Sequence, residues 1–374
     1  MALLNDEALT TRILDHLAAG TTDLAEGGIW REPVEHYLSP QRLRREIETV
    51  LRRRFVAFCP SAALPTAGSY LTRSAAGVPL VAVRDRDGRP RVFRNACRHR
   101  GTALVSGRGH ATSLVCPYHG WVYGLDGALR HVPDEYGFPG LDRATHGLVP
   151  VAAVERGGLV FVAQDGPPDP GELDDVPDLV GAEQTVFDSG EVTLEANWKI
   201  LLEGFLEGYH IKATHRATFF PFGYDNVTVV ETCGRHSRVT FPFRRIEALR
   251  EVAAPRRRID EMATLVYHVF PNVIVARLSQ HTAVVVLEPA GIDRTRLVSY
   301  QLVNRAGADE ARAAKDAKFV DVGTEEDRDM ARAVQHGLES GANDALEFGR
   351  FEGAIVHFHR QLAALLDADQ AAPR

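Results

Sequence analysis

The sequence is poor in cysteine and has no long apolar run. Only four cysteines occur in 374 residues, which is too few for a disulfide scaffold. No apolar run approaches the roughly 18 residues that a membrane span needs. The first residues also lack the basic segment and apolar run of a signal peptide. We therefore expect a cytoplasmic protein that does not bind a membrane.

An excess of basic charge is absent as well. The net charge is −7, and the short arginine clusters are interrupted by acidic or apolar residues, so we expect no nucleic-acid partner. The chain contains no glycine-rich fingerprint for a dinucleotide or a flavin. If the protein carries out redox chemistry, its electrons must therefore come from a separate protein.

The length suits about two domains. Residues 1–55 are predicted to be helical, with Ser39 as a helix cap followed by Pro40 at the first helical position. Short β-runs then suggest a small antiparallel sandwich or barrel over residues 56–165. Two of its hairpins are predicted to turn at Asp87-Gly88 and at Asp126-Gly127.

A loop rich in Pro, Gly and Asp begins near residue 165 and is the predicted boundary of a third part, residues 166–374. This part is predicted to begin with strands at residues 191–195, followed by a helix that opens with Asn197 as its N-cap. The strands of a large antiparallel sheet come next, and the chain is helical from about residue 308. These patterns predict an α+β protein. The N-terminal helical segment is expected to pack with the third part.

Two cysteine–histidine pairs are the most informative feature of the sequence. Cys97 and His99 are separated by one residue, sixteen residues follow, and Cys116 and His119 are separated by two. Two thiolates and two imidazoles can hold a structural zinc ion or a Rieske [2Fe–2S] cluster. The C-x-H spacing in β-hairpin loops favours the cluster, because zinc sites usually separate their first two ligands by two to four residues. Gly101 and Gly120 are expected to let the loops bend.

A second candidate metal site lies about a hundred residues later, in EGFLEGYHIKATH. Glu203, Glu207 and His210 have i, i+4, i+7 spacing, which predicts one face of a continuous helix. His215 reaches the same metal only if the helix ends or bends after His210, for which Lys212-Ala213-Thr214 is the expected exit. Two histidines and a distant carboxylate would make the facial triad of non-haem Fe(II) oxygenases.

Three stretches carry a resemblance to a known family: NACRHRGTAL, CPYHGWVYGLDG and NWKILLEGFLEGYHIKATH. They resemble the α subunits, or terminal oxygenases, of the Rieske non-haem iron oxygenases in the aromatic-ring-hydroxylating dioxygenase family. The likeness covers nearly the whole chain. It implies a carboxylate ligand shortly before a V-Q pair, and in EEDRDMARAVQ this role falls on Asp327, with Asp329 and Asp344 as alternatives.

One position departs from the family pattern. Most members carry aspartate three residues before the first iron histidine, whereas this chain has Glu207. The resemblance implies that this acid links an iron-ligating histidine to a Rieske histidine of a neighbouring subunit. Some members that act on carnitine-like quaternary amines look similar at this position. Glu203 is a second candidate for the link, although we expect it to be an ordinary acid on a helix face.

The resemblance implies a Rieske domain followed by a catalytic domain of helix-grip type. It implies a terminal oxygenase that uses O2, with electrons from NAD(P)H that arrive through a reductase or ferredoxin, to oxidise a small aromatic or amine substrate. A homotrimer is expected. Demethylation at N or O and oxidation of a quaternary amine are the alternatives within the family, and a Rieske electron carrier without iron is a more distant one. His357 and His359 are expected not to bind metal, because side chains two residues apart do not share a helix face.

Overall fold

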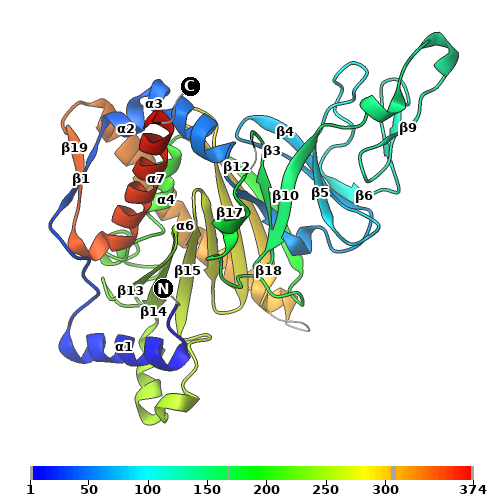
Figure 1. The fold of residues 1–374 in the computed structure, drawn as a ribbon. Coiled ribbons are helices and arrows are strands. Elements are labelled where there is room, and N and C mark those ends of the chain that lie inside the picture. Colours follow the sequence, from blue (N-terminus) through cyan, green and yellow to red (C-terminus); the bar gives the residue numbers. More distant parts are fainter. Residues whose placement is uncertain (1–2, 167, 305–308, 372–374) are drawn as a thin grey trace. The chain divides into compact units, whose positions relative to one another are not determined.

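The computed structural model describes residues 3–166, 168–304 and 309–371. The chain divides into two compact units (Figure 1). The larger unit comprises Met1–Val50, Asp174–Pro177 and Glu183–Arg374, and the smaller unit comprises Leu51–Leu173 and Asp178–Ala182. No helix among the described residues is long and apolar enough to cross a membrane.

The smaller unit is built from two antiparallel sheets. One has seven strands in the order β2-β11-β10-β5-β4-β3-β6, and the other has three in the order β7-β8-β9. The predicted hairpins are confirmed, because β4 pairs with β5 around Asp87-Gly88 and β8 pairs with β9 around Asp126-Gly127. The strands of the two sheets are β2 (Val56–Pro60), β3 (Ser69–Ala75), β4 (Val78–Arg84), β5 (Pro90–Arg94), β6 (Arg108–His110), β10 (Pro150–Arg156), β11 (Leu159–Ala163), β7 (Leu114–Val115), β8 (Val122–Tyr123) and β9 (Leu129–His131).

The core of the larger unit is a seven-stranded antiparallel sheet in the order β12-β18-β17-β16-β15-β14-β13. Helices pack against it: the short α4 and the long α6 contact β17, while α7 contacts β13 and β14 (Figure 1). Its strands are β12 (Val186–Leu194), β13 (Val229–Cys233), β14 (His236–Pro242), β15 (Ala263–Val269), β16 (Val273–Arg277), β17 (His281–Pro289) and β18 (Thr295–Val303). The helices are α1 (Asp6–Ala19), α2 (Glu35–Leu38), α3 (Pro40–Arg45), α4 (Trp198–Glu203), α5 (Ile211–Thr214), α6 (Glu310–Glu339) and α7 (Gly353–Ala371).

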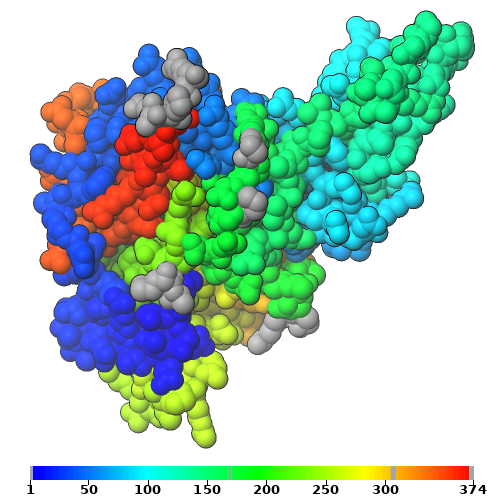
Figure 2. All heavy atoms as spheres, in the orientation of Figure 1, coloured from blue at the N-terminus to red at the C-terminus, as the bar shows by residue number. Residues whose placement is uncertain are grey.

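The N-terminal segment is less helical than its sequence predicts. Ser39 does cap α3, since its hydroxyl accepts the Arg42 N–H. However, β1 (Trp30–Pro33) is a strand, and it pairs with β19 (Ala345–Phe348). A partner more than three hundred residues away decides this local structure, so the prediction of helix was wrong there. Figure 2 shows α1 on the outside of this unit, where it packs beside the segment 244–256.

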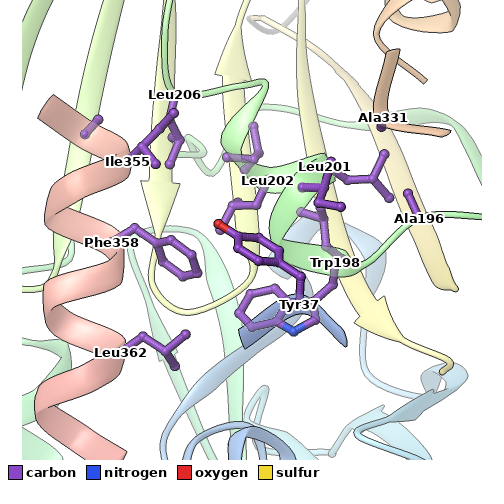
Figure 3. Packing of buried hydrophobic residues seen from close by; sticks show 14 of the residues in the cluster. Tyr37, Ala196, Trp198, Leu201, Leu202, Leu206, Ala331, Ile355, Phe358 and Leu362 are labelled. Atoms are coloured by element: carbon purple, nitrogen blue, oxygen red, sulfur yellow. The ribbon is translucent and has the colours of Figure 1, made fainter. Parts of the chain in front are cut away.

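The Asn-Trp-Lys segment anchors α4 inside the larger unit. The Asn197 side chain caps the helix by accepting the Lys199 N–H, as predicted. Lys199 Nζ lies 2.9 Å from both Glu46 carboxylate oxygens, and both side chains are fully buried. Removing one member of such a pair leaves an unpaired buried charge, which typically costs about 3–5 kcal/mol. The rings of Trp198 and Phe358 of α7 pack edge to face with centroids 5.6 Å apart, and Tyr37 belongs to the same core (Figure 3), so α4 is firmly held just before the second candidate metal site.

Candidate cluster and iron sites

The two cysteine–histidine loops share one backbone pattern. In each loop, the cysteine carbonyl accepts the N–H of the glycine four residues later, namely Gly101 or Gly120, at 2.9 and 3.0 Å. Each cysteine N–H donates to the carbonyl of the residue directly after that glycine, Thr102 or Trp121, at 2.8 Å in both loops. Both glycines have positive φ, which most other residues avoid. The expected bends are thus confirmed, and the loops form two matching halves of one site.

The side chains of these loops gather at one end of the smaller unit. Cys97 and Cys116 are buried in its core, while His119 is exposed. The Nδ1 atoms of His99 and His119 are 3.1 Å apart, so both can bind the same metal ion. Tyr123 lies behind the cysteines, with its hydroxyl 3.3 Å from Cys97 Sγ.

The arrangement fits a two-metal cluster better than a single zinc ion. With bonds of about 2.0–2.3 Å, zinc would hold all four ligand atoms within roughly 4 Å of one another. Among the described residues, only His210, His215 and Asp327 bring three such atoms within 4.8 Å. Neither cysteine sulfur therefore lies within 4.8 Å of both histidine nitrogens, and this suits a cluster in which two irons separate the thiolates from the imidazoles.

The second site brings together three side chains that the sequence selected. His210 Nε2 and His215 Nε2 lie 3.4 and 2.8 Å from the same oxygen of Asp327, on α6. Two neutral imidazoles and one carboxylate on one side of a metal are the donor set of non-haem Fe(II) sites. Asp329 points elsewhere, since its carboxylate pairs with Arg332.

A second carboxylate orients each histidine. Glu207 Oε1 accepts a hydrogen bond from His210 Nδ1, and Glu326 Oε2 lies 2.8 Å from His215 Nδ1. With the Nδ1 protons held this way, both Nε2 atoms face Asp327 as free ligands. Sequence reasoning assigned no role to Glu326, although its position directly before Asp327 was visible.

These contacts govern where protons lie in the metal-free site. Burial disfavours a charged His210, but hydrogen bonds to Asp327 and Glu207 outweigh burial and raise the pKa of His210 to about 10. Burial alone would raise the pKa of Asp327, yet the two histidines lower it. The site thus attracts positive charge, and a bound metal ion would displace the protons.

The predicted continuous helix is wrong. Helix α4 ends at Glu203, the chain then turns, and His210 and His215 flank the one-turn helix α5. The expectation that Glu203 is an ordinary helix-face acid is also wrong, because Glu203 is buried and accepts a hydrogen bond from the Tyr37 hydroxyl. His281 is buried and pairs with Asp316 at 2.9 Å.

Comparisons with known proteins agree with this geometry. Residues 178–368 match the family described as "Ring hydroxylating alpha subunit (catalytic domain)", and residues 54–142 match the "Rieske [2Fe-2S] domain". The chain therefore belongs to the α subunits of the ring-hydroxylating Rieske oxygenases.

Individual proteins of known name are similar to this chain in sequence or in structure. The chain is 28% identical to a chloroplastic choline monooxygenase of Beta vulgaris over 352 residues, which cover 87% of this chain and 75% of that one. It is 28% identical to the carnitine monooxygenase oxygenase subunit of Escherichia coli K12 over 360 residues, covering 89% and 93%. The crystal structure of the quaternary ammonium Rieske monooxygenase CntA with an inhibitor has a TM-score of 0.79 at 20% identity, covering 98% and 99%.

The family establishes the class of activity and its cofactors. The protein is a terminal oxygenase that takes electrons through a Rieske [2Fe–2S] cluster to a mononuclear iron and uses O2 to oxidise a small molecule. An electron-transfer protein supplies the electrons. The fold class predicted from the sequence, α+β with a Rieske domain and a sheet-and-helix catalytic domain, is confirmed.

Proposed function

We propose that Cys97, His99, Cys116 and His119 bind the Rieske cluster. We likewise propose that His210, His215 and Asp327 bind the mononuclear iron. The observation that carries the second assignment is the convergence of both histidine Nε2 atoms on one Asp327 oxygen, within 3.4 Å. When bound, the cluster would supply single electrons and the iron would supply activation of O2.

Glu207 is the proposed link between the two centres. Its carboxylate already holds His210 Nδ1, and a second hydrogen bond from a cluster histidine would complete the bridge. The histidine for this bond would come from a neighbouring copy in a head-to-tail homotrimer. The exposure of His119 supports this role, and inter-subunit electron transfer is named for a related quaternary ammonium Rieske monooxygenase.

The proposed substrate is a small quaternary ammonium compound, which the enzyme would oxidise at a carbon next to nitrogen. Relatives across most of the chain are named choline and carnitine monooxygenases, and the glutamate at position 207 agrees with such members. Ring hydroxylation is the second candidate, favoured by the description of the matching family. A reductase or ferredoxin fed by NAD(P)H would deliver the electrons. No disulfide joins any of the four cysteines, all of which lie among the described residues, and this suits a reducing cytoplasm.

Metal analysis tests the assignments directly. Protein purified without oxygen should contain about three irons and two acid-labile sulfides per chain, with the EPR signal of a reduced Rieske cluster. Cys116→Ser should lose the sulfides and keep one iron, whereas His215→Ala should lose one iron and keep the sulfides. Cys233→Ser is the control and should lose neither. Zinc without sulfide in the wild-type protein would contradict the proposal.

Oxygen uptake tests the substrate. With a surrogate reductase, the protein should consume O2 and form product from choline, glycine betaine or carnitine. Turnover of aromatic compounds, with none of the quaternary amines oxidised, would favour ring hydroxylation instead.

A further inference from the structure

Three phenylalanine rings form a row that begins at the iron site and ends at the protein surface. The centroid of the Phe219 ring lies 4.6 Å from that of His215, the second proposed iron ligand. The Phe319 ring, on α6, lies 6.0 Å from Phe219, and the Phe222 ring lies 5.5 Å from Phe319. Phe219, Phe319 and Phe222 are called the phenylalanine row below. The row is continuous from a metal ligand outward.

Two elements of the larger unit build the row. After the histidine, the chain turns tightly, and the Phe222 N–H donates to the Phe219 carbonyl at 3.0 Å. On α6, Phe319, Gly323 and Glu326 have i, i+4, i+7 spacing and therefore share one face. An added Cβ at Gly323 would lie 2.1 Å from the Phe219 ring. The missing side chain of this glycine is what lets the inner ring of the row lie against α6.

The two outer rings are not part of a core. Phe222 is 57% exposed and Phe319 is 41% exposed, although burial of rings of this size would stabilise the fold. Phe222 and Phe319 meet at 88°, and Phe319 and Phe219 meet at 69°, so the rings form corners and not a flat stack. Aromatic rings arranged as the walls of a cage bind quaternary ammonium ligands. The exposed rings are thus suited to a ligand.

The same segment of chain already binds a cation that belongs to the protein. The Arg244 guanidinium lies over the rings of Phe220 and Tyr224, at 5.3 and 5.2 Å from their centroids, which is within the range of a cation–π interaction. In the part of the chain that the structure describes, no arginine or lysine lies over a ring of the phenylalanine row. The row can therefore accept a cation from outside the protein.

We propose that the phenylalanine row binds the quaternary ammonium head of the substrate beside the iron site. This proposal rests on the proposed oxidation of a quaternary amine. A quaternary nitrogen has no N–H to donate, so aromatic faces are a principal means of recognising it. The carbon to be oxidised is next to this nitrogen, so the head must come close to the metal ligands. Phe219 packs on one of these ligands, while Phe222 and Phe319 meet the head at the surface.

The test compares a cation with an uncharged molecule of the same shape. Choline and 3,3-dimethylbutan-1-ol differ only in the central atom of the head, nitrogen or carbon, and glycine betaine and 3,3-dimethylbutanoate make a second such pair. In calorimetric titration of iron-loaded protein without O2, the wild type should bind the cationic member of a pair more tightly. Phe319→Leu should weaken that binding about 3–30-fold and leave the uncharged head nearly unaffected. Phe319→Trp should retain or strengthen it, because tryptophan is the best cation–π ring.

A second variant and a matched control complete the experiment. Phe222→Leu should weaken binding of the cation in the same way as Phe319→Leu. Phe220→Leu is the control, because this ring lies in the same segment but already carries the Arg244 guanidinium, and cation binding should not change. Iron content, sulfide content and molecular mass from light scattering should be the same in all variants.

Three results would overturn the proposal. The first is a wild-type protein that binds both members of each pair equally, because the rings would then act only as apolar surface. The second is wild-type affinity for the cation in both Phe319→Leu and Phe222→Leu. The third is a Phe319→Leu variant with an altered molecular mass and an unchanged cation affinity, which would assign the exposed rings to a contact between subunits.

The failures of the two proposals differ. A wild-type protein that oxidises a quaternary amine, beside Phe319→Leu and Phe222→Leu variants with the same KM for it, overturns the phenylalanine row alone. A wild-type protein that couples O2 uptake to product with no quaternary amine overturns the proposed substrate, and the role of the row with it.

Discussion

Glu326 holds the ring of His215, the second proposed iron ligand: Glu326 Oε2 lies 2.8 Å from His215 Nδ1. The next residue along α6, Asp327, faces Nε2 of the same ring at 2.8 Å. Thr218 donates to Glu326 Oε2 at 2.5 Å, which fixes the carboxylate. Two successive helix residues thus act on opposite sides of one imidazole. One of them orients the ring, and the other would bind the same metal ion as the ring under the proposed assignment.

The first prediction concerns Glu326→Gln. The amide is a weaker acceptor for the His215 N–H, so the ring loses both orientation and basicity, and iron affinity should fall about 10–100-fold. Equilibrium dialysis with Fe(II) measures this, with sulfide content as the check that the cluster is intact. Glu325→Gln is the control, because Glu325 pairs with Arg328 and Arg332 on the exposed side of α6. Equal affinities for both variants would show that Glu326 is not needed.

The second prediction concerns Glu207. Glu207→Gln should keep the cluster and, at saturating Fe(II), the iron, but it should slow oxidation of the reduced cluster severely. The reason is that a neutral amide bridges two imidazole N–H groups poorly. Stopped-flow absorbance of the cluster after mixing with O2 and substrate gives the rate. Glu207→Asp, which restores the acid usual in the family, should recover part of it. Unchanged turnover in Glu207→Gln would place the bridge elsewhere.

The third prediction concerns the reduction potential of the cluster. The Tyr123 hydroxyl lies 3.3 Å from Cys97 Sγ and also accepts the Arg98 N–H at 3.0 Å. A hydrogen bond to a cluster ligand favours the reduced, more negative state. Tyr123→Phe removes it. At about 1 kcal/mol for the bond, the midpoint should fall on the order of 40 mV.

Redox titration followed by EPR measures the midpoint of the cluster. Tyr118→Phe is the control, because Tyr118 is exposed and its hydroxyl accepts a hydrogen bond from Arg100 rather than facing a cysteine. A Tyr123→Phe midpoint equal to that of the wild type would mean that the hydroxyl does not act on the thiolate.

The fourth prediction uses two glycines of α6. A Cβ at Gly323 would lie 2.1 Å from the ring of Phe219, whose centroid is 4.6 Å from that of His215. Gly323→Ala should therefore displace Phe219, destabilise the protein by about 1–3 kcal/mol and weaken iron binding. A Cβ at Gly337 would meet nothing within 4 Å, so Gly337→Ala should stabilise the helix by about 0.5–1 kcal/mol. Thermal unfolding of the two variants measures whether their stabilities change in these opposite directions. Their iron content measures the effect on metal binding.

The sequence predicted the candidate ligands because metal sites repeat strict residue types at strict spacings. Spacing alone could not predict the path of the chain between them. The i, i+4, i+7 pattern of Glu203, Glu207 and His210 indicates a helix, but Gly204 and Gly208 interrupt it, and glycine disfavours helix. The two glycines therefore argued against a continuous helix, but the prediction followed the spacing of the acidic and histidine residues instead. Strand β1, by contrast, depends on pairing with β19, and no local pattern reveals a partner so far along the chain.

Buried polar partners were also out of reach. Glu203 and His359 are 156 residues apart in sequence, and only the packing of α7 beside α4 makes them neighbours. Each residue taken alone has the ordinary appearance of a helix-face side chain. The expectation that His357 and His359 would not share a face was sound in principle, but it says nothing of what each of them contacts.

The last prediction concerns acid stability. His268 is fully buried between strands; its Nε2 donates to the Pro271 carbonyl at 3.0 Å, and Phe358 packs against its ring. Burial lowers the pKa of His268 to about 3 and that of His236, a neighbour in the sheet, to about 4. In the unfolded chain a histidine has a pKa near 6.5. Between about pH 6.5 and 4, the unfolded state therefore binds more protons, and the native state loses stability as the pH falls.

As the pH falls through this window, each such histidine should lower the free energy of unfolding by up to about 1.4 kcal/mol per pH unit. Above pH 6.5 it should contribute nothing to the pH dependence. In His268→Gln, which retains a donor for Pro271, the slope should be flatter by up to that amount. Urea unfolding of the metal-free protein at several pH values, followed by circular dichroism, measures it. His336→Gln is the control, because the His336 side chain is 92% accessible and its removal should leave the slope unchanged. A wild-type slope retained in His268→Gln would mean that His268 becomes charged in the native state, in conflict with its burial against the aromatic core.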